Sequence, residues 1–411
     1  MLWIKMGWRN LWRNRRRSLI ELISIAGSIF LAVFVNNLSV GSYDKMVDDG
    51  VLMGSGHIGL YRTNYLELRK TELTMEAKPL VSALEKETSV QAVYPRLHVP
   101  GLVRSSRDSR TSLVVGLDIN REKNSNPILE GDKIVEGTLP SQDDSKEALM
   151  GEVLARELGL KVGNKFVIMV QGAQGEIVSS LFRVSGLIRT NAQMIDAEMV
   201  IVPRSVLGEV IGRKDSAHEI AVILHNHRLI KKAFPGISAI ARTRDDVEAF
   251  RWEKAMPGMF NAIRMDHIGF QIIVVFMYLI VGIGTINTLL MSVMERIREF
   301  GVIRAIGLNK NGIRKIVLSE AFVLAVTGVI IGTVLALAAG LYTAKHGIDY
   351  SFAMKDQGIA NTLIDPIMYS GWDWISTAVL GGGMILLALA ASLYPAHYIL
   401  KTSPSEAMRK Y

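Results

Sequence analysis

Four long apolar runs divide the chain, at residues 18–43, 268–294, 316–344 and 372–396. No charged residue follows Glu21 in the first run, and the second run has none. A helix rises about 1.5 Å per residue, so about 20 apolar residues cross a hydrocarbon core that is about 30 Å thick. Each run is long enough for this. The pattern therefore predicts four transmembrane helices.

Residues 44–267 show a different pattern, in which short apolar runs alternate with segments rich in Gly, Pro, Asp and Asn. This pattern is typical of strands joined by turns. We predict strands at residues 57–61, 90–99, 111–117, 165–170, 181–188, 198–203 and 219–224, and helices at 79–87 and 152–158. None of these runs is long enough to span a membrane. We therefore expect an α+β domain on one side of the membrane, with residues 120–150 as a candidate boundary between two lobes.

The distribution of charge predicts on which side that domain lies. Residues 41–268 contain equal numbers of basic and acidic side chains, so the net charge of +8 comes from other segments. The excess of Lys and Arg lies beside the apolar runs, in residues 5–17, 295–315 and 397–411. Basic flanks stay in the cytoplasm, so both termini, with a tail at 397–411, are predicted to be cytoplasmic. The domain and the loop 345–371 are then extracytoplasmic, and no nucleic-acid partner is expected because the domain carries no basic excess.

The N-terminal segment, residues 1–17, combines arginines with Ile4, Trp8, Leu11 and Trp12 at helical spacing. This combination predicts an amphipathic helix on the cytoplasmic membrane surface. The n-region of a signal peptide is the alternative, but the apolar run that follows is long and has no small-residue cleavage site. An uncleaved signal anchor is the better interpretation.

The sequence contains no catalytic motif. It has no cysteine, no phosphate-binding P-loop, and no zinc-protease or serine-hydrolase signature. His225 and His227 are close in sequence, but a metal site usually needs three or four convergent ligands. We therefore predict no catalytic residue, no metal site and no cofactor bound by this chain.

Ionisable residues are also missing from the middle of the predicted spans. Glu21 and Glu320 lie at cytoplasmic ends, where a long side chain can reach water. Ion-coupled carriers usually place carboxylates in mid-membrane, so that class is disfavoured. Asn36 and Asn37 lie near the outer end of the first span. We interpret them as residues of the headgroup zone, with a polar cavity as the alternative.

The charged segment 295–315 is longer than a simple connection between two spans requires. Its composition favours a helix from its first residue up to Gly307, in which Arg296 can pair with Glu299. Gly307 is suited to end this helix in a left-handed conformation. Asn309 can then cap a second helix that continues into the third span. The sequence predicts a helix–turn–helix hairpin on the cytoplasmic side.

Small residues recur every four positions in the third apolar run, at Gly328, Gly332, Ala336 and Gly340. They share one face of a helix and allow another helix to approach closely. The stripe therefore predicts helix packing, either within one subunit or between the two subunits of a dimer. The sequence favours neither of these two alternatives.

Several motifs together resemble one family of membrane proteins. The run ERIREFGVIRAIG, residues 295–307, closely resembles the signature that precedes the third span in FtsX-like ABC permeases. Residues 148–164 are similar to the strand–helix–turn of the MacB-type periplasmic core domain. Residues 394–396 with 403–409 are similar to the closing motif of the family, and residues 8–13 also fit. The resemblance covers essentially the whole chain and rests on these motifs in combination.

The resemblance implies an α-helical membrane protein of the cell inner membrane, with four transmembrane helices plus an α+β extracytoplasmic domain of the MacB-type periplasmic core. It implies a second permease subunit, identical or different, and a separate cytoplasmic ABC ATPase dimer that carries ATP and Mg²⁺. The hairpin 295–315 corresponds to the coupling helix, which is seated in a groove of the ATPase. The positions expected to carry this coupling are Glu295, Glu299, Arg304, Gly307 and Lys310. ATP-driven motion would then move the outer domain, a mechanism called mechanotransmission.

Chain length favours the lipoprotein-release branch, because FtsX has a much smaller outer domain and MacB carries a fused ATPase that is missing here. In that branch the first two spans form a cavity for acyl chains. The candidates are Phe30, Phe34, Phe270, Phe276 and Met277, with lipid contact or core packing as the alternative. The expected function is extraction of lipoproteins from the membrane and transfer to a periplasmic chaperone. The alternatives are efflux of peptides or drugs, and a signalling scaffold that activates cell-wall hydrolases.

Overall fold

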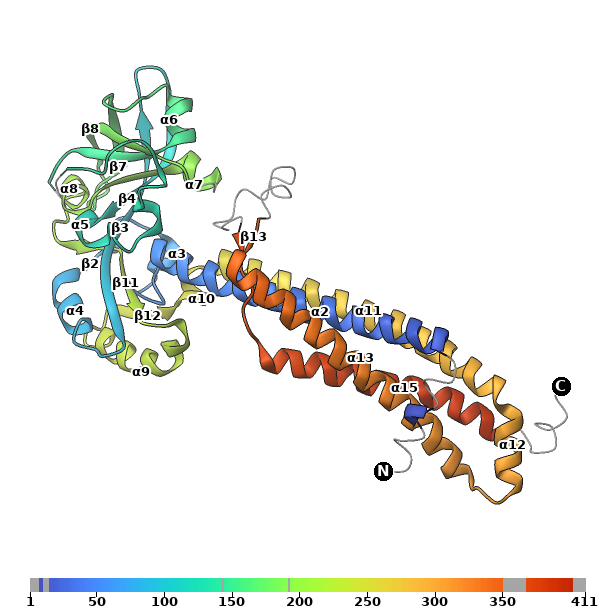
Figure 1. Cartoon of the computed structure of the whole chain (residues 1–411). Coiled ribbons are helices and arrows are strands. Elements are labelled where there is room, and N and C mark those ends of the chain that lie inside the picture. Colours follow the sequence, from blue (N-terminus) through green and yellow to red (C-terminus); the bar gives the residue numbers. More distant parts are fainter. Residues whose placement is uncertain (1–6, 10–14, 142–143, 191–192, 350–366, 402–411) are drawn as a thin grey trace. The chain divides into compact units, whose positions relative to one another are not determined.

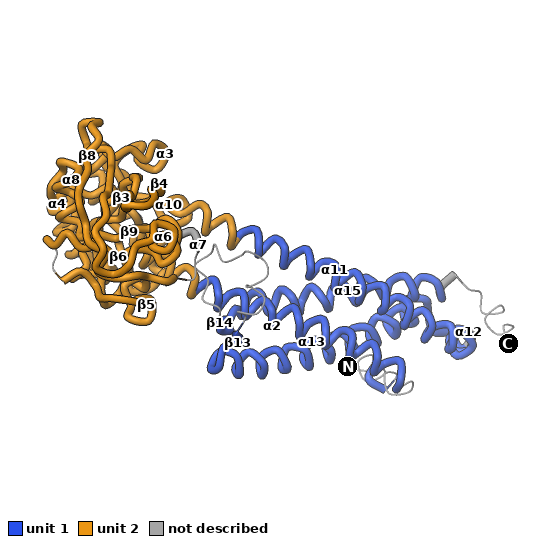
Figure 2. The backbone as a smooth tube through the Cα atoms, turned by 90° about the horizontal axis from the view of Figure 1, so that it is seen from above, with its two compact units in different colours: residues 1–44, 264–349, 367–411 blue, residues 45–263, 350–366 orange. Residues whose placement is uncertain are grey.

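The computed structural model describes residues 7–9, 15–141, 144–190, 193–349 and 367–401. The chain forms two compact units, one helical and one mixed (Figure 1 and Figure 2). The helical unit comprises residues 1–44, 264–349 and 367–411, and the α+β unit comprises residues 45–263 and 350–366. Most of the N-terminal segment 1–17, the loop 345–371 and the tail 397–411 lies outside the described residues, as do residues 403–409 of the closing motif.

The described residues contain four long helices, α2 (Arg15–Met53), α11 (Pro257–Glu295), α13 (Lys310–His346) and α15 (Trp374–Lys401). Each contains an apolar stretch long enough to cross a membrane, which confirms the prediction of four spanning helices. Helix α2 continues past the predicted span to Met53, and α11 begins before its span at Pro257. Helix α15 runs through Pro395 and ends at Lys401. Hydropathy marks the apolar part of a helix, whereas its polar extensions remain helical without an apolar signal.

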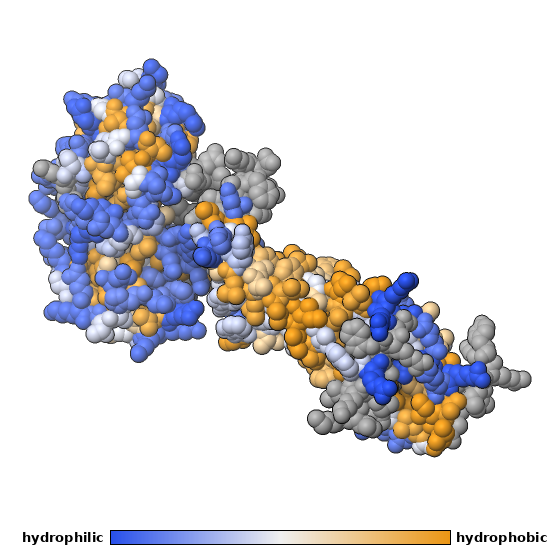
Figure 3. All heavy atoms as spheres, viewed as in Figure 1, coloured by the Kyte–Doolittle hydropathy of each residue, from blue (hydrophilic) through white to orange (hydrophobic). Residues whose placement is uncertain are grey.

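The core of the helical unit is built from all four long helices. It contains Ile25, Ile29, Val33, Val281, Val323, Leu324, Ala336 and Met384. Hydrophobic residues cover the middle of this unit, whereas the visible face of the α+β unit is mainly hydrophilic (Figure 3). The unit also contains the short helix α12 (Ile297–Ala305) and the antiparallel pair of β13 (Ile348–Asp349) and β14 (Ile367–Met368).

The small-residue stripe of α13 packs against α2 of the same chain. A Cβ atom on Gly332 would lie 2.4 Å from the carbonyl oxygen of Ala26, and one on Gly328 would lie 2.6 Å from Cγ2 of Ile25. Ala336 is fully buried in the shared core, and a Cβ on Gly340 would lie 3.3 Å from the Ser370 hydroxyl. Of the two alternatives that the sequence left open, the structure supports packing within one subunit.

Replacing Gly332 with valine should lower the stability of the helical unit, because the added side chain would overlap the α2 backbone. Overpacking of this kind costs about 1–3 kcal/mol. The matched control is Gly284→Val in α11, where a Cβ would meet nothing within 4 Å. The midpoint of thermal unfolding in detergent should fall for the first variant more than for the second. Equal losses in both variants would mean that the contact with α2 is not what requires glycine.

The α+β unit contains many short elements. Its strands are β1 (Ile58–Arg62), β2 (Met75–Glu76), β3 (Val90–Arg104), β4 (Ser109–Leu117), β5 (Ile134–Gly137), β6 (Glu147–Gly151), β7 (Lys165–Gln171), β8 (Ile177–Ile188), β9 (Met199–Pro203), β10 (Ser216–Ala217), β11 (Glu219–Leu224) and β12 (Val247–Arg251). Its α-helices are α3 (Tyr65–Leu68), α4 (Ala77–Leu84), α5 (Ile119–Glu122), α6 (Glu152–Leu158), α7 (Gln193–Glu198), α8 (Arg204–Val210), α9 (Ile230–Ala241) and α10 (Trp252–Ala255). The 3-10 turns are η1 (Pro127–Leu129) and η2 (His227–Leu229). All seven predicted strands are present, and α4 and α6 lie at the two predicted helices.

One sheet of ten strands runs through the unit, in the order β12-β1-β11-β3-β4-β9-β6-β8-β5, with β7 paired to β3 and β8. Strand β3 is the longest, with 15 residues. Up to Arg96 it pairs with β11, and from Leu97 onward it pairs with β4 and then also with β7. The long strand therefore belongs to both halves of the sheet (Figure 1).

Two separate hydrophobic cores show that the unit has two lobes. One core is formed by residues between 58 and 93 and between 217 and 247, and the other by residues between 97 and 211. The lobe boundary thus lies inside β3 and again just before β10. The prediction of a boundary at residues 120–150 is wrong, because this polar stretch packs into a lobe through Ile128 and Leu129.

A buried arginine lies where β3 passes from one lobe to the other. Arg96 is fully buried and forms an ion pair with the fully buried Glu122 at the end of α5, at 2.5 Å. Its guanidinium also donates hydrogen bonds to the carbonyl oxygens of Leu52 (2.5 Å), Met53 (2.9 Å) and Gly54, where α2 ends. Carbonyl groups at a helix C-terminus lack partners within the helix and carry partial negative charge. Arg96 therefore fixes the end of α2 to β3 and α5.

Candidate functional site

The segment between α11 and α13 folds as a hairpin. Gly307 has a φ of +110°, and its N–H donates to the Arg304 carbonyl at 3.1 Å, while the Leu308 N–H donates to the Ile303 carbonyl at 3.1 Å. These two bonds form a Schellman motif, which ends α12. The Asn309 side chain accepts a hydrogen bond from the Gly312 N–H at 2.8 Å and caps α13. The predicted helix end and helix cap are confirmed.

The first helix of the hairpin is shorter than the sequence suggested. Helix α11 ends at Glu295, and α12 begins only at Ile297, because Arg296 has a non-helical backbone (φ −106°, ψ 14°). The prediction of one helix from Glu295 is therefore wrong. The break turns α12 away from the axis of α11 and makes it a separate element at the end of the bundle (Figure 1).

A single aromatic side chain anchors α12 to the bundle. Phe300 is 2% exposed and packs in a cluster with Val293, Ile313, Ile316, Val317, Ala396 and Ile399. These residues come from the ends of α11, α13 and α15. A displacement of α12 would therefore be passed directly to three of the long helices, because close-packed side chains transmit strain.

Ion pairs add a second set of links around the hairpin. Glu295 accepts two hydrogen bonds from Arg17 of α2, at 2.8 and 3.1 Å. Arg296 pairs with Glu299 at 3.3 Å, as predicted, and with Glu320 at 3.3 Å. Glu320 was expected to reach water, but its side chain is only 12% exposed. The coupling candidates Glu295 and Glu299 are thus already paired inside the chain.

The outward face of α12 combines apolar and charged side chains. Arg298, Val302 and Ile306 lie four residues apart on one face of the hairpin. Ile306 is 83% exposed and Val302 is 42% exposed. A shallow groove along this face is lined by Glu295, Arg298, Glu299, Val302 and Ile303. We call Arg298, Val302 and Ile306 the outer face of the hairpin.

The structure brings all five coupling candidates to this hairpin or its edges. Gly307 and Lys310 are exposed at the turn, Arg304 is half-buried, and Glu295 and Glu299 border the groove. Sequence reasoning missed the apolar members of the outer face. Val302 and Ile306 could have been identified from their four-residue spacing inside a charged segment.

The five cavity candidates do not form one cluster. Phe30 and Phe34 stack with ring centroids 5.6 Å apart and pack against the bundle core. Phe270 and Met277 are half-buried on α11, and Phe276 is 62% exposed. Their role in substrate binding stays a prediction.

Three polar residues of the spans have surroundings that the sequence did not indicate. Glu21 is only 4% exposed and accepts a hydrogen bond from the Thr285 hydroxyl, so its expected contact with water is wrong. Asn36 and Asn37 are 5% and 1% exposed, so both pack inside the protein, and their place in the headgroup zone stays a prediction. Among the described residues, both side-chain polar atoms of Asn37 and the Asn36 amide nitrogen lack hydrogen-bond partners.

Two family matches together cover most of the chain. Residues 271–404 match the FtsX-like permease C-terminal family, and residues 18–250 match the MacB-like periplasmic core domain. The second match alone spans more than half of the 411 residues. The chain belongs to the FtsX-like, MacB-type permeases. This membership agrees with the resemblance of residues 295–307 and 148–164, and with the observed pairing of four spanning helices with an α+β domain.

Individual relatives of this permease fall into two kinds. The chain is 23% identical to the lipoprotein-releasing system transmembrane protein LolC of Neisseria meningitidis, over 97% of this chain and 95% of that protein. It is 24% identical to the pyoverdine export ATP-binding/permease protein PvdT of Pseudomonas syringae, over 89% of this chain and 56% of that protein. The crystal structure of the periplasmic region of MacB from Actinobacillus actinomycetemcomitans matches 53% of this chain, with 13% identity and a TM-score of 0.38. The two family matches and the LolC relatives show that the protein is an ABC transporter permease of the LolC and MacB type.

The MacB-type domain of this permease holds several titratable side chains in its interior. His227 lies 3.3 Å from Asp48, and His225 is not part of that pair. In the part of the chain that the structure describes, no group of three or more His, Asp or Glu side chains could hold a metal ion. The remaining buried groups are better described by their hydrogen bonds.

Two buried histidines are held in the neutral form. The Nδ1 atom of His57 accepts the Leu224 N–H at 3.1 Å, and Nδ1 of His218 accepts the His98 N–H at 3.2 Å. Burial lowers the pKa of each ring from 6.5 to about 4. Charging either ring would remove an acceptor from a backbone N–H and place a cation in the interior.

The permease should therefore lose stability as the pH falls from about 6.5 to 4. Below pH 6.5 the unfolded chain binds protons that the folded chain does not, so stability falls by up to about 1.4 kcal/mol per pH unit for each histidine. The midpoint of thermal unfolding in detergent, measured across this range, tests the effect. His57→Asn keeps an acceptor for Leu224 and should make the pH dependence shallower. An unchanged dependence in this variant would contradict the assignment.

Proposed function

We propose that this permease subunit, driven by a separate ATPase, extracts lipoproteins from the outer leaflet of the inner membrane and passes them to a periplasmic chaperone. The observation that carries the proposal is the end-to-end correspondence with LolC proteins, over 97–99% of this chain and 95–98% of theirs. The chain spans only about half the length of the PvdT and MacB relatives. The four spanning helices and the α+β domain provide the parts that such a function needs.

The hairpin is the proposed site of ATPase binding. Its outer face has apolar side chains surrounded by charged ones. In protein–protein interfaces a few central side chains carry most of the binding energy, and a rim of weaker contacts surrounds them. Phe300 and the pair of Arg17 with Glu295 would pass motion of α12 to the long helices. Helices α2 and α11 are continuous across residues 44–45 and 263–264, so each includes residues of both units. Such helices would carry the motion onward by mechanotransmission.

The complex is proposed to contain two permease subunits and two ATPase subunits, with ATP and Mg²⁺ on the ATPase. The buried Asn36 and Asn37 and the stacked Phe30 and Phe34 lie on α2. Amide groups without hydrogen-bond partners among the described residues, on the same helix as apolar rings, would suit a lipoprotein anchor, which has ester and amide groups beside acyl chains.

Affinity purification in mild detergent, followed by reconstitution of the purified complex into proteoliposomes, tests the proposal. We expect an ATPase and a permease subunit to co-purify, and an acylated lipoprotein to be released into solution when ATP and a chaperone are added. The matched control is the same lipoprotein without its acyl chains. Its presence in solution should not depend on the complex or on ATP. Failure to release acylated cargo, with ATPase activity intact, would refute lipoprotein extraction.

A second candidate is efflux of peptides or drugs. It is favoured by the matches to export ATP-binding/permease proteins, which are 24% identical to this chain. In the same proteoliposomes, ATP-dependent transport of a labelled peptide without release of lipoprotein would select this alternative.

A further inference from the structure

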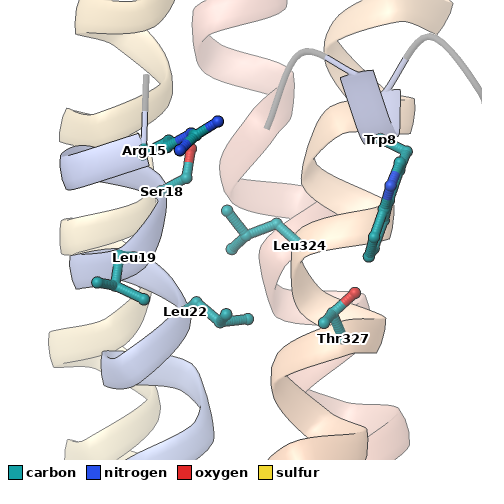
Figure 4. A pocket seen from close by; sticks show the side chains of 7 residues that line it. All are labelled: Trp8, Arg15, Ser18, Leu19, Leu22, Leu324 and Thr327. Atoms are coloured by element: carbon teal, nitrogen blue, oxygen red, sulfur yellow. The ribbon is translucent and has the colours of Figure 1, made fainter. Parts of the chain in front are cut away.

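A groove lies between α2 and α13 at the arginine-rich beginning of α2 (Figure 4). Its lining residues are Trp8, Arg15, Ser18, Leu19, Leu22, Leu324 and Thr327. Of the four residues of α2, Ser18 and Leu19 each lie three or four positions from both Arg15 and Leu22, so the four share one helix face. Trp8 lies alongside α13 in this view, and a Cβ on Gly7 would lie 2.9 Å from the Ser319 carbonyl, so this short piece touches α13.

The groove changes from polar to apolar along its length. Arg15 and Ser18 lie at one end, and the leucines lie further along the helices (Figure 4). Seven residues separate Arg15 from Leu22, which corresponds to about 10 Å along the helix axis. Because α2 carries an apolar stretch long enough to span a membrane, the leucine end of the groove lies within its apolar part. The groove thus has a cationic mouth and an apolar floor.

The charge at the mouth has no counterpart within the described chain. Of the three consecutive arginines 15–17, Arg17 is paired with Glu295. Arg15 forms no hydrogen bond or ion pair with any other described residue, and no acidic side chain is among the residues lining the groove. A guanidinium in this position favours an anion from outside the chain, and its planar fork binds phosphate, as it does carboxylate, in two-point contact. Beside an apolar floor, phosphate is the anion that a membrane lipid supplies.

We propose that this groove binds an anionic phospholipid, with the lipid phosphate on Arg15 and one acyl chain along Leu19, Leu22 and Leu324. The Ser18 hydroxyl is placed to donate to a phosphate or glycerol oxygen, and Trp8 lies at the level where indole rings meet headgroups. Basic pockets between transmembrane helices bind anionic headgroups in this way. A soluble anion would leave the apolar floor empty, and a zwitterionic lipid would bring a second cation close to Arg15 and Arg16. The inference requires only that the helices lie in a membrane, so it does not depend on the cargo.

Native mass spectrometry of the full chain, delipidated in a non-ionic detergent, tests this site. Phosphatidylglycerol and phosphatidylcholine with the same acyl chains are added in parallel, and bound lipid is counted. We expect the wild-type chain to retain at least about fivefold more phosphatidylglycerol. Arg15→Gln should remove this preference, whereas Arg15→Lys should retain most of it. The matched control Arg16→Gln removes the same charge one residue away, outside the lining of the groove.

A second pair of variants tests the apolar floor. Leu22→Trp should fill the groove and abolish retention of phosphatidylglycerol, whereas Ile23→Trp, on an exposed face that does not line the groove, should leave it unchanged. All variants are first checked for the unfolding midpoint of the lipid-free protein. Equal losses in Arg15→Gln and Arg16→Gln would assign the preference to diffuse surface charge and overturn the site. Displacement of the lipid by soluble glycerol phosphate, or equal retention of both lipids by the wild type, would also overturn it.

Discussion

Replacing Arg96 with methionine should lower the free energy of unfolding of the α+β unit by about 3–5 kcal/mol. Breaking a buried ion pair by removing one partner has this magnitude, because the remaining charge stays buried without compensation. Here Glu122 is fully buried and would keep only the Asn126 amide, which donates at 2.8 Å. The last carbonyl groups of α2 would lose their donors at the same time. Native-state hydrogen exchange of β3 and of the end of α2 measures the loss.

The matched control for this variant is Arg104→Met. Arg104 lies on the same strand and is exposed, so its replacement should change stability by less than about 0.5 kcal/mol. The double variant Arg96→Met with Glu122→Gln removes the uncompensated charge and should recover part of the loss. If the double variant were as unstable as the single one, the contacts of Arg96 with α2, rather than the ion pair, would account for its effect.

Replacing Ile306 with glutamate should weaken binding of the partner ATPase by about 30-fold. A large apolar side chain at the centre of a contact typically contributes about 2 kcal/mol, and 1.4 kcal/mol corresponds to a factor of ten. Ile306 is 83% exposed near the end of α12, so it contributes little to packing within the chain. Pull-down of the ATPase from detergent, and ATP hydrolysis by the reconstituted complex, measure the effect.

The control is the same substitution at Ile177, which is 76% exposed on β8 of the other unit. Ile177→Glu should bind the ATPase like the wild type, and both variants should insert into the membrane normally. Arg304→Glu and Glu299→Lys change charge beside the same face and should also reduce coupling. Wild-type hydrolysis in all three hairpin variants would show that α12 is not where the ATPase binds.

Some features of the hairpin could be predicted from local sequence patterns, and others could not. The helix end at Gly307 and the cap at Asn309 could be predicted, because each depends on residues within one turn of the helix. The break at Arg296 could not, because helix-forming composition continues across it. The exposure of Ile306 also escaped prediction, since the orientation of α12 depends on the anchoring of Phe300 to three other helices.

The sequence by itself determined the number of spanning helices, the seven main strands and the family. These follow from hydrophobic period, turn residues and contiguous motifs, which act over short distances along the chain. Tertiary structure alone decided that Arg96 binds Glu122 and the end of α2, that Glu21 is buried against Thr285, and that the glycine stripe packs within one chain. It also decided the lobe boundary and the groove at Arg15. Each of these depends on contacts between residues far apart in sequence, whose burial and partners no local pattern contains.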